Sequence, residues 1–161
     1  HKPGWDDQWE TFSTWAEKGQ VYKNSLLYLV DEDTNSFNRI IEAFRLPKGS
    51  SEEKAIRREA VENATKYATE IPFQVMQTAY QSIEVMQAMI EEGLPNSLSD
   101  AGVGVLCART AVIGAYFNVR INAKDIKDRK FADTILAKAA NIYKETIALE
   151  NEMMKLIDET I

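Results

Sequence analysis

One stretch limits the fold more than any other. Residues 97–126 show the spacing of a single long helix, with Ser97 and, three residues later, Asp100 as an N-terminal capping pattern. Steps of four and three residues mark one helical face. That face is polar at its ends and small in its middle: Asp100, Gly104, Ala108, Ala111, Ala115, Asn118, Asn122 and Asp125. A neighbouring helix can therefore approach its middle closely.

Two interpretations of this helix stay open. It is a core helix with hydrogen-bonded polar ends, or a core helix whose C-terminal part, residues 118–125, also lines a functional site. A second stripe is expected to carry its bulky core contacts: Val103, Leu106, Ile113 and Phe117.

Helical periodicity continues through the rest of the chain, and no strand-like alternation bounded by hairpin turns stands out. Residues 51–70 are highly charged, as is typical of a solvated face, and Ser50 and Glu53 form a capping box before them. Pro72 is expected to break or kink this segment. The sequence predicts an all-α fold, an antiparallel bundle of four to five long helices forming one domain over residues 1–161.

A carboxylate interrupts an apolar stripe in residues 21–44. The stripe comprises Tyr22, Leu26, Val30, Asp33, Phe37, Ile40 and Phe44. Burying an ionised carboxylate without a partner is costly, so Asp33 is either held by a helix end or an arginine inside the bundle, or is poised for acid–base chemistry. Asp31 lies on a nearby flank.

Composition excludes several classes of protein. The only histidine is His1 and the only cysteine is Cys107, which argues against histidine-based nucleophile arrangements, histidine-based metal sites and an intrachain disulfide. A net charge of −6 without a basic cluster argues against nucleic-acid binding. No apolar run is expected to span a bilayer, and a cytoplasmic location is favoured.

Three segments together resemble a known family. They are residues 29–38 (LVDEDTNSFN), 43–48 (AFRLPK) and 114–122 (GAYFNVRIN). In this combination, the chain resembles the cyclodeaminase domain of formiminotransferase-cyclodeaminase, a family that includes stand-alone methenyltetrahydrofolate cyclohydrolases. Members usually begin with a further helix after a glycine-rich segment, which this sequence is expected to lack.

The resemblance implies folate chemistry without a metal or a cofactor. The main expectation is conversion of 5-formiminotetrahydrofolate to 5,10-methenyltetrahydrofolate and ammonia, a step of histidine degradation. The alternatives are a methenyltetrahydrofolate cyclohydrolase and a non-catalytic, folate-binding bundle. A homodimer is also implied, which agrees with the three tryptophans in residues 1–20.

Residue roles follow from the same resemblance. Asp33 is expected to shuttle the proton and stabilise the methenyl cation, with Asp31 as the alternative. Asn118 and Asn122 would bind the pterin ring or orient the aspartate. The candidates for the anionic, optionally polyglutamylated tail are Arg45, Lys48, Arg120 and Lys124.

Overall fold

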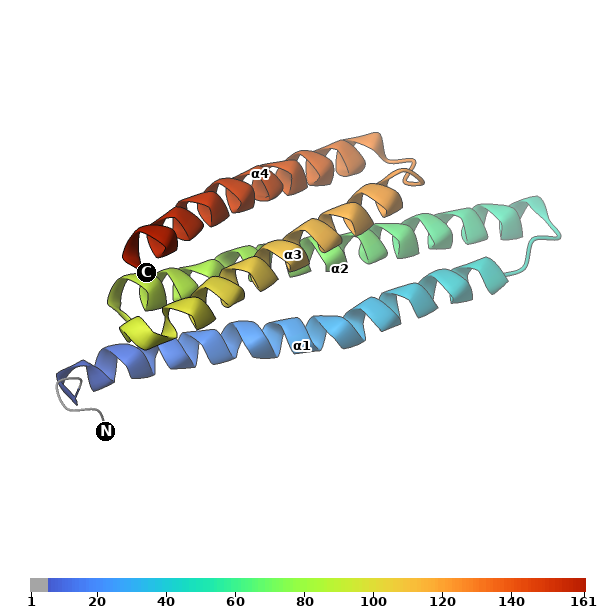
Figure 1. The fold of residues 1–161 in the computed structure, drawn as a ribbon. Helices are drawn as coiled ribbons and strands as arrows, with labels where there is room; N and C mark the ends of the chain where they lie inside the picture. Colours follow the sequence, from blue (N-terminus) through green and yellow to red (C-terminus); the bar gives the residue numbers. More distant parts are fainter. Residues whose placement is uncertain (1–5) are drawn as a thin grey trace.

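The computed structural model describes residues 6–161, so His1 and Trp5 lie outside it. After a short 3-10 turn, Asp6–Gln8, come the long helices α1, Trp9–Arg45, and α2, Ser51–Glu92. A second 3-10 turn, Pro95–Ser97, leads into α3, Leu98–Ala123, and α4, Arg129–Thr160. Successive long helices alternate in direction, so α1 and α3 run the same way (Figure 1). The predicted all-α antiparallel bundle is confirmed, with four long helices in the described part of the chain.

The close approach predicted for the small-residue face of α3 is present. A Cβ atom added at Gly104 would lie 2.8 Å from Met86 Cγ of α2, closer than real Cβ contacts. Ala108 and Ala115, further along the same face, are buried. Small residues therefore let α2 and α3 pack tightly along this face, as expected from the sequence.

The bulky stripe predicted for α3 is not the core stripe. Val103 and Phe117 are 59% and 51% exposed, and Val105, Val112 and Val119 are fully buried instead. The burial pattern follows these three valines at seven-residue intervals, because α3 contacts both α2 and α4 along that line. The bulkier side chains are left at the edge of that contact and face outward.

The expectation that no segment is long and apolar enough for a bilayer needs correction. The helical segment Pro95–Ala123, with a mean hydropathy of 1.4, is long enough and apolar enough to cross a membrane by length and composition alone. A third of its most apolar window is buried inside the bundle. A core helix of a soluble protein meets the same criteria, so the finding by itself is weak evidence for a membrane.

The caps predicted for the helix starts are confirmed at one helix and absent at another. Ser50 and Glu53 form the predicted capping box at the start of α2, with Glu53 N donating to Ser50 Oγ at 3.1 Å. At the start of α3, in contrast, the Ser97 side chain makes no capping hydrogen bond. The expected break at Pro72 is absent, because α2 continues through it from Ser51 to Glu92.

Helix α1 packs on α2 through a line that the sequence pattern did not single out. Leu29, Ser36 and Ala43, spaced by seven residues, are its buried side chains. The predicted apolar stripe is rotated away from this line, so Phe37 and Phe44 are 62% and 52% exposed. A stripe of large residues cannot approach a neighbouring helix as closely as Ser36 and Ala43 do.

Candidate functional site

A groove of about 550 Å³ opens where the C-terminal ends of α1 and α3 meet the N-terminal half of α2. This is the end of the bundle at the right of Figure 1. We call it the three-helix groove, and its lining residues are Ile40, Phe44, Lys54, Arg57, Arg58, Val61, Glu62, Thr65, Ile121, Asn122, Asp125 and Lys127. It brings together two apolar walls and a set of charged and hydrogen-bonding groups.

The groove is locally basic although the chain is acidic. Four of its lining residues are cations, Lys54, Arg57, Arg58 and Lys127, and two are carboxylates. Arg57 is anchored, since its Nε donates to the carbonyl oxygen of Phe44 at 3.1 Å and its guanidinium lies 5.3 Å from the Phe44 ring centroid. The groove therefore offers an attractive environment for an anion.

One of the two carboxylates is already engaged. Glu62 Oε1 accepts from the backbone N–H groups of Lys127 and Asp128, both at 2.9 Å, at the turn before α4. Burial would raise the pKa of the Glu62 carboxyl, but these backbone hydrogen bonds outweigh it and hold that pKa below its ordinary value. Glu62 thus ties α2 to the turn between α3 and α4.

Asn122 has a structural partner. Its Nδ2 donates to the carbonyl oxygen of Ala68 at 2.7 Å. In a helix that carbonyl normally accepts from the residue four positions later, which here is Pro72 and carries no N–H. The amide therefore satisfies a carbonyl that the proline leaves without its helical donor, and its Oδ1 remains for a further hydrogen bond.

Two more predicted residues lie on the walls that lead into the groove. At about 100° per residue, Asp33 lies within about 20° of both Ile40 and Phe44 around the α1 axis. Asn118 lies about 40° from Asn122 around the α3 axis, on the side of Ile121. Both side chains are exposed. Along α1, Asp33 lies about 10 Å before Ile40, and along α3, Asn118 lies about 6 Å before Asn122, in both cases on the side away from the C-terminal end of the helix.

Asp31 lies elsewhere on α1. It is about 160° from Asp33 around the axis and exposed, so it points away from the three-helix groove.

The cations expected to bind the tail do not line the groove. Arg120 is exposed about 160° around α3 from Asn122 and lies over the Tyr116 ring, 5.5 Å from its centroid. Lys124, just past α3, and Arg45, at the end of α1, are exposed. Lys48 is exposed in the turn between α1 and α2.

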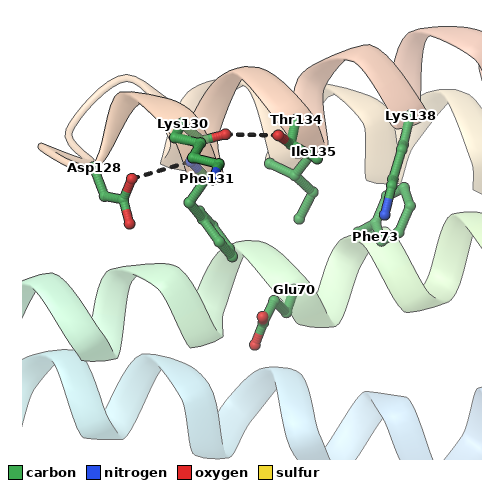
Figure 2. A pocket seen from close by; sticks show the side chains of 8 residues that line it. All are labelled: Glu70, Phe73, Asp128, Lys130, Phe131, Thr134, Ile135 and Lys138. Carbon is green, nitrogen blue, oxygen red and sulfur yellow. Dashed lines mark hydrogen bonds between the residues drawn. The ribbon is translucent and has the colours of Figure 1, made fainter.

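A second hollow of about 390 Å³ lies between α2 and α4 (Figure 2). Phe73 and Phe131 contribute aromatic side chains to it, and Lys130 and Lys138 project from α4. Asp128 is used there as a cap, accepting from Phe131 N at 3.1 Å. This hollow contains none of the residues expected to act on a substrate, so the three-helix groove is the better candidate site.

Sequence reasoning missed the cations of the groove. Lys54, Arg57 and Arg58 lie in the charged segment interpreted as a solvated face. A signal was present, because Lys54, Arg58, Val61 and Thr65 follow the four- and three-residue steps of one face. Only the position of α1 and α3 shows that this face borders a groove. Across residues 6–161, no group of three or more His, Cys, Asp or Glu side chains is arranged to hold a metal ion.

Comparison with known proteins agrees with this architecture. The chain is 31% identical to a methenyltetrahydrofolate cyclohydrolase from Methylorubrum extorquens, over 90% of this chain and 70% of that protein. It is 33% identical to the formimidoyltransferase-cyclodeaminase of Mus musculus, over 74% of this chain and 22% of that longer protein.

A solved formiminotetrahydrofolate cyclodeaminase from Thermotoga maritima has the same fold, with a TM-score of 0.76 and 21% identity, over 99% of this chain and 73% of that one. The family model described as formiminotransferase-cyclodeaminase matches residues 1–141. The chain belongs to the formiminotransferase-cyclodeaminase family.

Proposed function

We propose that the protein is a folate one-carbon enzyme that converts 5-formiminotetrahydrofolate to 5,10-methenyltetrahydrofolate and ammonia. Family membership supports folate one-carbon chemistry. The observation that carries the proposal is the placement of Asp33 and Asn118 on the walls leading to the three-helix groove, which Asn122 lines. One carboxylate and two amides thus lie on the faces of α1 and α3 that continue into the groove.

The reaction needs one group that first takes and then returns a proton. N10 of the folate attacks the carbon of the protonated formimino group and forms the new C–N10 bond. The Asp33 carboxylate accepts the proton that N10 loses and delivers it to the amino group on the same carbon. The C–NH₃ bond then breaks, ammonia leaves, and the carboxylate stabilises the methenyl cation. Such acid–base help is typically worth about a hundredfold to ten-thousandfold in rate.

A cyclohydrolase is the second candidate. The similarity to the Methylorubrum extorquens protein, which has that name, favours it. Here water attacks the carbon of the methenyl cation and Asp33 takes a proton from it, which leaves a hydroxyl group on that carbon. Asp33 then returns the proton to N5, the hydroxyl proton goes to solvent, and the C–N5 bond breaks to give 10-formyltetrahydrofolate. The same residues serve both reactions. The cyclodeaminase releases ammonia from the reacting carbon, whereas the cyclohydrolase adds water to it.

The deciding experiment measures ammonia released from 5-formiminotetrahydrofolate together with the absorbance of methenyltetrahydrofolate. Ammonia and the methenyl compound in equal amounts would establish the cyclodeaminase and place the protein in histidine degradation. Hydrolysis of the methenyl compound without ammonia release would establish the cyclohydrolase. Folded protein inactive on both substrates would reject an enzymatic role and leave the non-catalytic bundle.

Substitution separates the two aspartates. We expect Asp33→Asn to lower kcat by at least about a hundredfold, because asparagine cannot accept the proton. Asp31→Asn should keep wild-type turnover, since Asp31 faces away from the groove. Full turnover by Asp33→Asn, with loss in Asp31→Asn, would transfer the catalytic role to Asp31.

We also propose that the protein is a cytoplasmic homodimer in which a second copy covers the rims of the groove. Phe37 on α1 and Phe117 and Ile121 on α3 are more than half exposed, and such large apolar surfaces usually mark an interaction site. Sedimentation equilibrium should give a dimer, and Phe117→Lys should shift it toward a monomer. A wild-type chain that sediments as a monomer, or that pellets with membranes after cell lysis, would contradict this arrangement.

A further inference from the structure

We propose that the hollow between α2 and α4 is a second binding site, which takes a small carboxylate that carries an aromatic ring. None of the residues that line this α2–α4 hollow also lines the three-helix groove, so the proposal does not depend on the folate reaction. Its volume of about 390 Å³ lies within the range of about 300–1,000 Å³ typical of small-molecule sites. The hollow combines an apolar floor with positive charge at its rim, and the two features together define the ligand.

The floor of the α2–α4 hollow is apolar and continues into the core of the bundle. Phe73 comes from α2, and Phe131 and Ile135 come from α4. Ile135 is 6% exposed and belongs to a core cluster against which both phenylalanine rings pack while staying partly exposed. In Figure 2, Phe131 and Ile135 point from α4 toward α2. A flat ligand in the hollow would thus contact an aromatic ring from each helix, an arrangement that stabilises beyond the burial of area alone.

The Phe131 ring is held in place without a ligand. The ammonium group of Lys66 lies 5.4 Å from the centroid of this ring. Lys66 is fixed in turn by a 2.8 Å ion pair with Asp128 Oδ2, and Asp128 Oδ1 accepts from the backbone N–H of Phe131 at 3.1 Å. Because these contacts position the ring in advance, a ligand loses less free energy in ordering this wall of the hollow.

Two cations at the rim of the hollow have no partner of their own. Lys130 and Lys138 project from α4, and neither forms an ion pair with another residue in the described part of the chain. In Figure 2, the Lys138 side chain extends from α4 toward α2 and ends beside the aromatic ring there. The acidic residues do not cancel this charge, because Asp128 is paired with Lys66 and the Glu70 carboxylate points away from α4 in Figure 2. Positive charge beside an apolar floor attracts an anion.

These two features select the class of ligand. An aromatic ring fits against Phe73 and Phe131, and a carboxylate attached to it by a short chain would reach the ammonium group of Lys138. A cation of the same shape would be repelled by the lysines. A small anion without a ring would leave the apolar floor in contact with water, and would lose the larger part of the binding free energy.

The test uses 3-phenylpropionate as the probe, with 3-phenylpropanamide and propionate as matched ligands that lack the charge and the ring. Titration of the full chain, followed by ¹H–¹⁵N NMR, should give saturable shifts of the backbone amide signals of Phe73, Thr134 and Lys138. The signals of Ile121 and Asn122, in the three-helix groove, should not move. Propionate should bind roughly tenfold to a hundredfold more weakly, and the amide roughly twofold to fivefold more weakly.

Substitution tests the role of the lysine. Lys138→Met keeps the aliphatic stem and removes the charge, so it should weaken phenylpropionate binding by roughly twofold to fivefold and leave the affinity for phenylpropanamide unchanged. Lys144→Met, which removes an exposed charge elsewhere on α4, is the matched control and should change neither affinity.

Three results would overturn the proposal. The first is equal affinity of the wild-type protein for the acid and the amide, which would show that the lysines do not recognise the carboxylate. The second is a set of saturable shifts confined to the three-helix groove, which would assign the probe to the proposed folate site. The third is the absence of saturable shifts in folded protein up to about 10 mM probe. Folate turnover is not the readout, so each result stands whether or not the proposed reaction is confirmed.

Discussion

Asn122 Nδ2 donates a 2.7 Å hydrogen bond to the carbonyl oxygen of Ala68, the acceptor that Pro72 leaves without its helical partner. The side chain of one helix thus repairs the hydrogen-bond pattern of another. Ala68 is 5% exposed, so water has little access to replace this bond. The contact also fixes the depth of α3 against α2 beside the three-helix groove, and makes Asn122 structural as well as a candidate for substrate binding.

This pairing predicts a specific coupling. Asn122→Ala should lower the free energy of unfolding by about 1–3 kcal/mol, because it leaves a buried carbonyl unsatisfied. In a Pro72→Ala background the backbone N–H of residue 72 can bond to Ala68, so the same substitution should cost much less. Urea unfolding of the four proteins measures the cycle. Additive effects, within about 0.5 kcal/mol, would show that Pro72 and Asn122 are independent.

Two glycines of α3 should respond oppositely to alanine. Gly104→Ala should destabilise the protein by about 1–3 kcal/mol, because the new Cβ would overlap Met86 Cγ and force the helices apart. Gly114→Ala meets nothing within 4 Å and should stabilise by about 0.5–1 kcal/mol through helix propensity. Thermal and urea unfolding check both. Equal effects at the two sites would argue against close packing of α2 and α3 at Gly104.

The backbone hydrogen bonds accepted by Glu62 predict a loss of stability in acid. The hydrogen bonds from Lys127 and Asp128 hold the pKa of Glu62 below its ordinary value of 4.5, against the effect of burial. Its stabilising contribution is therefore complete above about pH 4.5 and disappears as the pH falls through the lower folded-state pKa. Glu62→Gln should be less stable at neutral pH and show a shallower decline in acid. Glu59→Gln, on an exposed position of α2, should follow the wild-type curve.

At alkaline pH the Tyr22–Glu84 contact predicts the opposite dependence. The Tyr22 hydroxyl donates to Glu84, which also accepts from Lys18 Nζ at 2.6 Å. Burial, followed by the hydrogen bond and the negative charge of Glu84, raises the pKa of Tyr22 from 10.0 to about 12. The contribution of the Tyr22–Glu84 contact to the free energy of unfolding is complete below pH 10 and disappears between pH 10 and about 12.

Chemical denaturation across this alkaline range tests it. Tyr22→Phe should lose less stability than wild-type protein as the pH rises, since no proton is then lost beside Glu84. A conservative control, Tyr143→Phe, keeps the ring that stacks on Tyr116. A Tyr22→Phe curve parallel to that of the wild-type protein would mean that Tyr22 contributes nothing to the alkaline loss.

Local features of this protein followed from the sequence because they depend on neighbours along the chain. Helical periodicity identified the long helices, and the capping box of Ser50 and Glu53 marked the start of α2. The small residues of α3 indicated its close packing, and three motifs identified the family.

Tertiary structure decided which faces are used. Periodicity places Val30, Phe37 and Phe44 on one apolar stripe, yet α1 packs through Leu29, Ser36 and Ala43, because smaller side chains allow a closer approach to α2. The cations Lys54 and Arg58 belong to a charged segment whose composition is typical of a solvated face. They line a groove only because α1 and α3 pack beside that segment. Periodicity shows which residues share a face of a helix, but what that face meets depends on helices distant in the sequence.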